Sequence, residues 1–365
     1  MSLAVSTPRC WYRPRKAFKS PLWRIVADHL DTFLSGYDGR FRHTHGPLRP
    51  EVEKSLFAFS QCGDPNLGVV LFKCLPCKVT LGVPFSCKDR ICPSCIARKA
   101  EQTSIQLVER IPRVDHRHLV ISLPKKMGLR QRIQEDRRLF RELARTVNHT
   151  IRRHIVANIR THRNRRADIQ KARPGIVVAQ HSWGSTLNFH PHFHLCISDG
   201  AFTVDGQFYR LWDWKPKELL EALRRAILRT FVRLDKLTPQ AADILAGWEP
   251  ERSGFSLFIG PVIPADDREA LARLISYLCR SPISFRQLTY QETTGRVRLQ
   301  LKRGGVKEWA NPLDFLADLS LHIPRARQQT ITYAGHYANS TGKSVLFPYT
   351  TLFRSYTLSQ DRKSV

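Results

Sequence analysis

The sequence predicts an α+β fold in which an antiparallel sheet carries helices on one face and follows a small cysteine-rich domain. Strand-like segments with alternating or continuous apolar residues lie at 116–123, 175–180 and 190–197. Segments with apolar residues at helical spacing lie at 129–161, 219–234 and 266–279. Six of the nine cysteines lie between residues 51 and 110, before the first of these strands. Strands and helices that alternate irregularly in this way are typical of α+β domains.

The strand at 190–197 is expected to pair with 175–180 through the loop at 182–188. Residues 22–34 form an amphipathic stretch that precedes the cysteines. Three further elements follow the helix at 219–234: a strand at 255–262, a hairpin of 285–291 with 295–302, and a short helix at 312–319. These elements extend the predicted sheet and its helical cover toward the end of the chain.

The chain is strongly basic, with 59 lysines and arginines against 31 acidic residues and a formal net charge of +28. So large an excess favours a polyanionic partner, and nucleic acid is the first candidate; a basic surface that only keeps the protein soluble is the alternative. No run of 18 apolar residues occurs, so no membrane association is expected, and the N-terminus lacks a secretory signal. We therefore expect a cytoplasmic protein whose cysteines are reduced.

The cysteines are spaced as ligands of a structural zinc ion. Cys74-x2-Cys77 and Cys92-x2-Cys95 are separated by fourteen residues, and four thiolates complete a tetrahedron without an open position. Cys87 is a possible replacement for one of these ligands, and Cys62 is a weaker candidate. Basic residues flank the cluster and are predicted to contact phosphates: Lys88, Arg90, Arg98 and Lys99.

Three histidines alternate along the strand at 190–197. Because side chains of a strand point to opposite faces in turn, His190, His192 and His194 share one face, and the other face is apolar. Histidines two positions apart on a strand are roughly 6.5 to 7 Å apart, so their rings can converge on one cation. The alternative is an ordinary polar face of a strand that faces solvent.

A metal site beside a basic surface suggests phosphoryl chemistry, with either water or a side chain as the nucleophile. Tyr277 is the best-placed side chain, because it ends an amphipathic helix and Arg280 follows on the same side, able to meet a phosphate. The alternative is a core tyrosine with a hydrated hydroxyl. Tyr333 and Tyr337 rank second as nucleophiles.

Several motifs together resemble the rolling-circle transposases of the insertion sequence 91 family. They occur in family order between about residues 36 and 340, and comprise Phe85-Ser86-Cys87-Lys88, Cys92-Pro93-Ser94-Cys95, His192-Phe193-His194, Ser198-Asp199-Gly200-Ala201-Phe202 and Tyr277-Leu278-Cys279-Arg280-Ser281-Pro282-Ile283. The resemblance implies a zinc-binding domain followed by an HUH endonuclease domain, named for two histidines around a hydrophobic residue. In such a domain the two histidines and a third ligand hold Mg²⁺ or Mn²⁺.

The resemblance also implies that Tyr277 attacks single-stranded DNA at transposon ends, which leaves a 5′-phosphotyrosine and a free 3′-hydroxyl. His192 and His194 are then the metal ligands. For the third ligand we expect Gln180, on the neighbouring strand, and His190 after it. Original family members carry two tyrosines four residues apart, but Arg273 stands four residues before Tyr277. The chain therefore resembles a single-tyrosine branch.

These motifs divide the chain into an N-terminal helical segment (1–50), a zinc-binding domain (51–110), a catalytic domain (111–292) and a C-terminal extension (293–342). Residues 343–365 contain FPYTTLFRS and DRKSV, which match translations of common sequencing-adapter DNA, so we expect a non-native tail there. Two other functions compatible with the motifs are a metal-dependent single-strand nuclease that uses water and a zinc-containing DNA-binding protein without catalysis. Neither the oligomeric state nor the DNA sequence that is recognised follows from these motifs.

Overall fold

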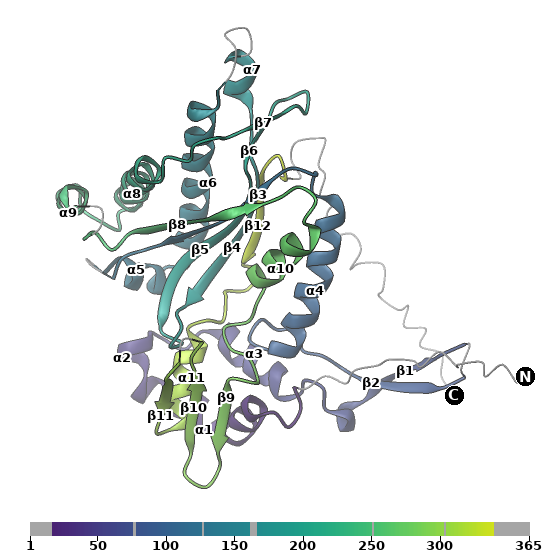
Figure 1. The fold of residues 1–365 in the computed structure, drawn as a ribbon. Coiled ribbons are helices and arrows are strands. Elements are labelled where there is room, and N and C mark those ends of the chain that lie inside the picture. Colours follow the sequence, from purple (N-terminus) through teal and green to yellow (C-terminus); the bar gives the residue numbers. More distant parts are fainter. Residues whose placement is uncertain are drawn as a thin grey trace, which may run out of the picture.

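A five-stranded antiparallel sheet forms the centre of the protein (Figure 1). The computed structural model describes residues 17–75, 78–125, 128–160, 166–249, 252–302 and 304–338. The strand order is β12-β4-β5-β3-β8. Their bounds are β3 (His116–Ser122), β4 (Gly175–Trp183), β5 (Phe189–Ser198), β8 (Ser256–Ile263) and β12 (Ile331–Gly335). The predicted α+β class is confirmed. The predicted tail at 343–365 lies outside the described residues.

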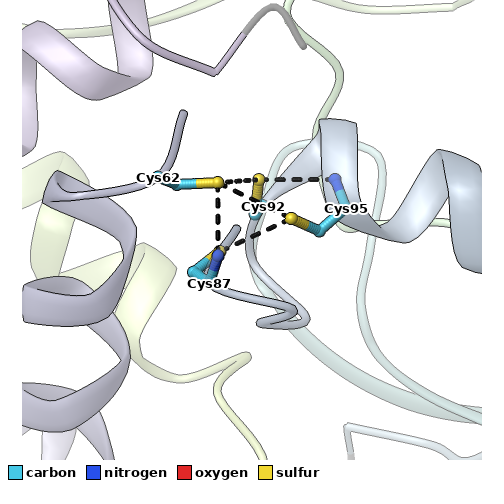
Figure 2. Close-up of side chains that lie close together, drawn as sticks. All are labelled: Cys62, Cys87, Cys92 and Cys95. Carbon is cyan, nitrogen blue, oxygen red and sulfur yellow. Dashed lines mark hydrogen bonds between the residues drawn. The ribbon is translucent and has the colours of Figure 1, made fainter. Parts of the chain in front are cut away.

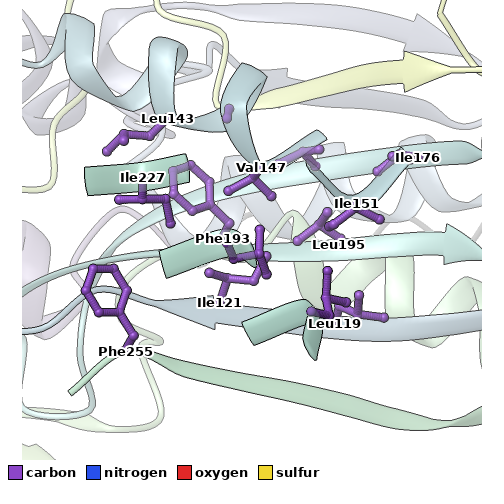
Figure 3. Close-up of a cluster of buried hydrophobic side chains, with 14 of the residues drawn as sticks. Leu119, Ile121, Leu143, Val147, Ile151, Ile176, Phe193, Leu195, Ile227 and Phe255 are labelled. Atoms are coloured by element: carbon purple, nitrogen blue, oxygen red, sulfur yellow. The ribbon is translucent and has the colours of Figure 1, made fainter. Parts of the chain in front are cut away.

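Two long helices, α6 (Arg138–Asn158) and α8 (Pro216–Arg233), cover one face of this sheet. The apolar side of α6 packs against the non-histidine face of β5, where Phe193 is fully buried (Figure 3). The ring of Phe193 meets that of Phe140 edge to face, with centroids 6.0 Å apart. Burial of an aromatic side chain of this size contributes about 1.5 to 3 kcal/mol to folding stability. Packing of Phe193 against α6 therefore determines that the histidine face of β5 points away from α6 and α8.

The opposite face of the sheet carries α10 (Arg268–Leu278), and α4 (Pro93–Arg110) packs along α10. Helix α10 begins at Asp267, whose carboxylate accepts a hydrogen bond from the Ala270 amide at 2.8 Å. Leu271 and Ile275 of α10 pack against β4 and β5. The sequence predicted helices on one face; α10 adds partial cover on the other, where β5 presents its histidines.

Segments from both ends of the chain share a second core. It contains α1 (Pro21–Arg40), α3 (Pro50–Ser60), α11 (Pro312–Ser320) and a three-stranded sheet of order β11-β10-β9. Its strands are β9 (Leu288–Gln291), β10 (Arg296–Gln300) and β11 (Val306–Trp309). The predicted hairpin is present as β9 and β10. In Figure 1 this part lies below the central sheet, at the end where β4 meets β5.

The remaining elements are short, and one long helix predicted from sequence is divided. The range 129–161 was expected to be continuous, but the structure has α5 (Leu129–Glu135) and α6 with Asp136 extended between them. The Asp136 carboxylate accepts hydrogen bonds from the backbone and side chain of Arg138, which favours the break. The other elements are α2 (Arg42–His45), η1 (Pro65–Leu67), β1 (Val69–Lys73), β2 (Thr80–Pro84), α7 (Arg166–Lys171), β6 (Gly200–Phe202), β7 (Phe208–Arg210) and α9 (Pro239–Gly247).

Among the described helices, none combines the length and hydropathy that a membrane span requires.

Candidate active site and cysteine cluster

Three buried histidines from two adjacent strands meet on the face of the sheet next to α10. His192 and His194 alternate on β5, and their Nε2 atoms are 3.0 Å apart. His181 of β4 is the register partner of His192. One nitrogen from each of the three rings lies within 4.8 Å of the others, so the group can hold a metal ion.

Hydrogen bonds to the backbone determine which ring nitrogens are free. Nε2 of His181 donates to the carbonyl of Leu278 at 2.9 Å, and Nδ1 of His192 donates to the carbonyl of His190 at 2.7 Å. The opposite nitrogens therefore keep their lone pairs. Nδ1 of His181 is buried and has no hydrogen-bond partner in the described part of the chain. A buried nitrogen without a partner suits a metal ligand.

The three imidazoles are held neutral. Burial lowers the pKa of His192 to about 4 and that of His194 to about 2, and the pKa of His181 falls well below its usual value of 6.5. The positive charge of Arg280 adds to each effect. Only neutral imidazole can donate its lone pair to a cation, so the site is prepared for metal at neutral pH.

A fourth histidine, His118 of β3, supports the group. Its Nε2 lies 2.9 Å from Nδ1 of His194, and the two rings stack with centroids 5.2 Å apart. Sequence reasoning missed both His118, which lies in the predicted strand at 116–123, and His181, which lies one residue beyond the predicted strand at 175–180. The signal for His118 was its alternation with His116, which places it on one face of β3.

The expectation that Gln180 provides the third ligand is wrong, because its side chain lies on the other face of the sheet. Gln180 pairs with Phe193, which packs against α6, whereas its neighbour His181 pairs with His192. Directly opposed residues of antiparallel strands share a face. His181 therefore lies on the face of His192, and Gln180, one position earlier, lies on the face of Phe193. His190 lines the same cavity as His192 but lies outside the three-histidine group.

Tyr277 lies next to the histidines. Its ring centroid is 5.3 Å from that of His194 and 5.9 Å from that of His118, with the rings nearly perpendicular in both pairs. The position follows from α10: its apolar residues face the sheet, and Tyr277 stands in the last turn, where the helix reaches β5. The structure therefore brings together the tyrosine and the histidine pair that the sequence selected separately.

A cavity of about 950 Å³ opens at this point. Its lining includes His192, His194, Tyr277, Arg280 and Lys302. The guanidinium carbon of Arg280 lies 4.2 Å from the centre of the Tyr277 ring, within cation–π distance. A phosphate that enters the cavity meets the tyrosine, the histidines and positive charge together.

Tyr337, ranked second as a nucleophile, is fully buried below the sheet surface. Its hydroxyl lies 2.7 Å from Nε2 of His116, and Nδ1 of His116 donates to the carbonyl of Val114 at 2.7 Å. The tyrosine hydroxyl must then donate to Nε2, and burial raises its pKa well above 10. This tyrosine has a structural role. Tyr333 lies in β12, at an edge of the sheet.

Four cysteines form a second cluster between α3 and α4 (Figure 2). The Sγ atoms of Cys62 and Cys95 are 3.6 Å apart, those of Cys87 and Cys95 are 3.7 Å apart, and those of Cys62 and Cys92 are 3.8 Å apart. Cys92 caps the start of α4, and Cys95 lies in its first turn. Four thiols at this spacing suit a closed tetrahedral site.

This cluster differs from the predicted ligand set. Cys74 lies at the end of β1, outside the group, and Cys77 is outside the described residues. Among the described cysteines, Cys62 and Cys87 complete the group with Cys92 and Cys95. Cys62 follows α3, and its loop contacts that of Cys87 through a hydrogen bond from the Gly63 amide to the Phe85 carbonyl at 2.9 Å. The predicted role of Cys74 in this cluster is therefore wrong.

The four basic residues predicted to bind DNA lie close in sequence to the clustered cysteines. Lys88, Arg98 and Lys99 are exposed, while Arg90 is half-buried. Burial lowers the pKa of Arg90. The structure places three of the four where a phosphate can reach them.

Two protein-family models match this chain. One, described as "Transposase zinc-binding domain" and built for the insertion sequence 91 family, matches residues 31–123, which include all four clustered cysteines. The other, described as "Putative transposase", matches residues 175–344, which include the three histidines and Tyr277. The chain belongs to the insertion sequence 91 family of transposases.

Curated relatives agree with this assignment. The chain is 27% identical over 319 residues to the "Transposase for insertion sequence element IS801" of Pseudomonas savastanoi pv. phaseolicola, which covers 80% of this chain and 72% of that protein. It is 27% identical over 180 residues to "Putative transposase y4qJ" of Sinorhizobium fredii, which covers 47% of this chain and 40% of that protein. No solved structure matches the chain.

Proposed function

We propose that this family member cleaves and rejoins single-stranded DNA at transposon ends, with Tyr277 as nucleophile. The observation that supports this most directly is the position of the Tyr277 ring, 5.3 Å from that of His194 across a shared cavity. In the reaction the phenol oxygen bonds to phosphorus while the bond from phosphorus to the 3′ oxygen breaks. The phenol loses its proton to water, and the departing 3′ oxygen gains one. The 5′-phosphotyrosine keeps the bond energy for rejoining.

A divalent cation, Mg²⁺ or Mn²⁺, would be held by His181, His192 and His194. The fit rests on the buried Nδ1 of His181, which has no hydrogen-bond partner among the described residues, and on the backbone hydrogen bond of His192 Nδ1, which leaves the lone pair on its Nε2. When bound, the ion would neutralise a phosphate oxygen and favour in-line attack. Three imidazoles leave positions open for oxygen ligands. Imidazole is a softer donor than the oxygens that Mg²⁺ prefers, so Mn²⁺ is the better probe.

The protein residues supply orientation and charge. Helix α10 holds the Tyr277 ring edge-on to the histidines, and Arg280 offers a guanidinium to the same phosphate. Positioning the phenol beside the phosphorus makes the attack effectively unimolecular.

We further propose that Cys62, Cys87, Cys92 and Cys95 bind a structural zinc ion and that Lys88, Arg98 and Lys99 bind the DNA backbone nearby. We also propose that the domains of the chain end at residues 50, 110, 292 and 342. We propose further that the protein acts on bacterial DNA in the cytoplasm.

The decisive experiment is detection of a covalent complex. Wild-type protein with Mn²⁺ and a single-stranded oligonucleotide from the end of its element should give a complex stable to SDS, and peptide mapping should find the DNA on Tyr277. Tyr277→Phe should give none. Cleavage without a complex would favour the nuclease that uses water. DNA binding without cleavage, unaffected by His192→Ala, would favour the non-catalytic protein.

A further inference from the structure

Lys302 approaches the proposed nucleophile from outside the histidine sheet. Its Nζ lies 5.5 Å from the centre of the Tyr277 ring, which Arg280 also approaches. Lys302 stands just beyond β10, whose sheet shares a core with the N-terminal helix α1. The tertiary fold, and not a local motif, therefore brings this second cation to the cavity.

Hydrogen bonds between described residues hold the backbone next to Lys302. The Leu301 amide donates to the Gly305 carbonyl at 3.1 Å, and the Gly304 amide donates to the Leu301 carbonyl at 3.2 Å. Gly304 and Gly305 have φ values of 83° and 81°, in the left-handed region that favours glycine. Leu301, which precedes Lys302, and Gly304, which follows it, also line the cavity. The backbone of Lys302 is thus held at the rim of the site.

Positive charge at this rim is not balanced by ion pairs within the described part of the chain. Arg280 and Lys302 form no ion pair with any described carboxylate, and the buried Nε of Arg280 has no hydrogen-bond partner among these residues. Glu101 is the single acidic residue among the described residues that line the cavity. Burial, and then the nearby charge of Arg280, lowers the pKa of Lys302. Two neighbouring cations repel each other, and an anion placed between them removes that cost.

We propose that Lys302 is a second catalytic cation, which contacts a non-bridging oxygen of the scissile phosphate. The inference rests on the proposed function and deepens it. Attack by the phenol adds negative charge to the oxygens of the phosphorus, and fixed cations at those oxygens stabilise that charge. The C-terminal extension thereby completes the active site.

The test compares Lys302→Met, Lys302→Arg and a control, Lys217→Met, on α8 at the far face of the sheet. With excess protein and Mn²⁺, Lys302→Met should form the covalent complex about 100-fold more slowly than wild type, as expected for loss of one charge-stabilising donor. Lys302→Arg should restore the rate to within about tenfold, and Lys217→Met should match wild type. Wild-type rates for Lys302→Met, or an arginine variant as slow as the methionine variant, would overturn the proposal.

A substrate with a methylphosphonate at the cleaved bond separates a charge contact from a structural defect. It lacks the charged oxygen, so wild type and Lys302→Met should react at the same rate. A persistent difference of about 100-fold would show that Lys302 acts through structure. If neither protein cleaves this substrate, the rescue by Lys302→Arg decides.

Binding measured in EDTA provides a readout without metal or cleavage. In Lys302→Met the slope of log affinity against log salt concentration should be smaller by about 0.7, because one contact to a phosphate of the single strand is lost. Lys217→Met should keep the wild-type slope. An unchanged slope in Lys302→Met would contradict the contact. Absence of any tyrosine-linked complex in wild type would overturn the proposed function instead, and this slope would still report on Lys302.

Discussion

His181 and Gln180 are adjacent in sequence and lie on opposite faces of the sheet, which makes them a sharp test of the proposed metal site. His181→Phe removes the free Nδ1 while it keeps a ring that can stack on Trp183, whose centroid is now 4.2 Å away. Gln180→Ala removes a polar side chain from the same strand without touching the histidines. Only the first should weaken metal binding.

The size of the effect follows from the role assigned to His181. Loss of residues that merely orient a ligand costs 10- to 100-fold in metal affinity, so loss of one of three ligands should exceed about 100-fold, or about 2.8 kcal/mol. The substitution also leaves the Leu278 carbonyl without its donor, at a separate cost of about 1 to 3 kcal/mol in folding stability.

Calorimetric titration with Mn²⁺ measures the first quantity, and thermal unfolding in EDTA measures the second. Gln180→Ala should bind Mn²⁺ within about threefold of wild type, less than the loss caused by an orienting residue. The reasoning fails if His181→Phe keeps wild-type affinity while folded, or if Gln180→Ala loses as much affinity as His181→Phe.

Three further outcomes are expected. Tyr337→Phe should lower the free energy of unfolding by about 1 to 3 kcal/mol, because Nε2 of His116 loses its donor, yet should still form the covalent DNA complex. Cys62→Ser should lose bound zinc in a chelator assay, whereas Cys74→Ser should retain it. Burial lowers the pKa of His322 to about 4, so the unfolded chain binds more protons below about pH 6.5, and stability should fall from there toward pH 4. If the denaturation midpoint of His322→Gln falls less steeply with decreasing pH than that of wild type, this contribution of His322 to the pH dependence of stability is confirmed.

The face of each strand could be predicted from sequence, but the alignment of neighbouring strands could not. Alternation along 190–197 placed His192 and His194 on one face, and the structure agrees. The third member depends on which residue of β4 stands opposite His192. That register is set by the loop at 184–188 and by the fit of β4 against α6 and α10, and a shift of one residue exchanges Gln180 for His181.

The cysteine cluster shows the same limit at longer range. Spacing rules treat Cys-x2-Cys as a unit, which selected Cys74 and Cys77 together. Cys62 is 25 residues from Cys87, and its Sγ accepts a hydrogen bond from the Cys87 amide at 3.5 Å only because the loop after α3 folds back on the loop before α4. No local pattern encodes that approach, whereas Cys92 and Cys95, one turn apart, were correctly placed in the cluster.

The two clusters are mechanically connected through α4. The cysteines hold the first turn of this helix, and its later turns pack along α10, which ends at Tyr277 and Leu278. The Ser281 hydroxyl, just beyond α10, also donates to the carbonyl of Ile91 at 3.5 Å, beside the cluster. A phenol must be placed closely to attack phosphorus, because a misplacement of about 1 Å can cost 100-fold in rate. On the proposed mechanism, we therefore expect the cysteine cluster to support catalysis by fixing α4, the helix against which α10 and its Tyr277 pack.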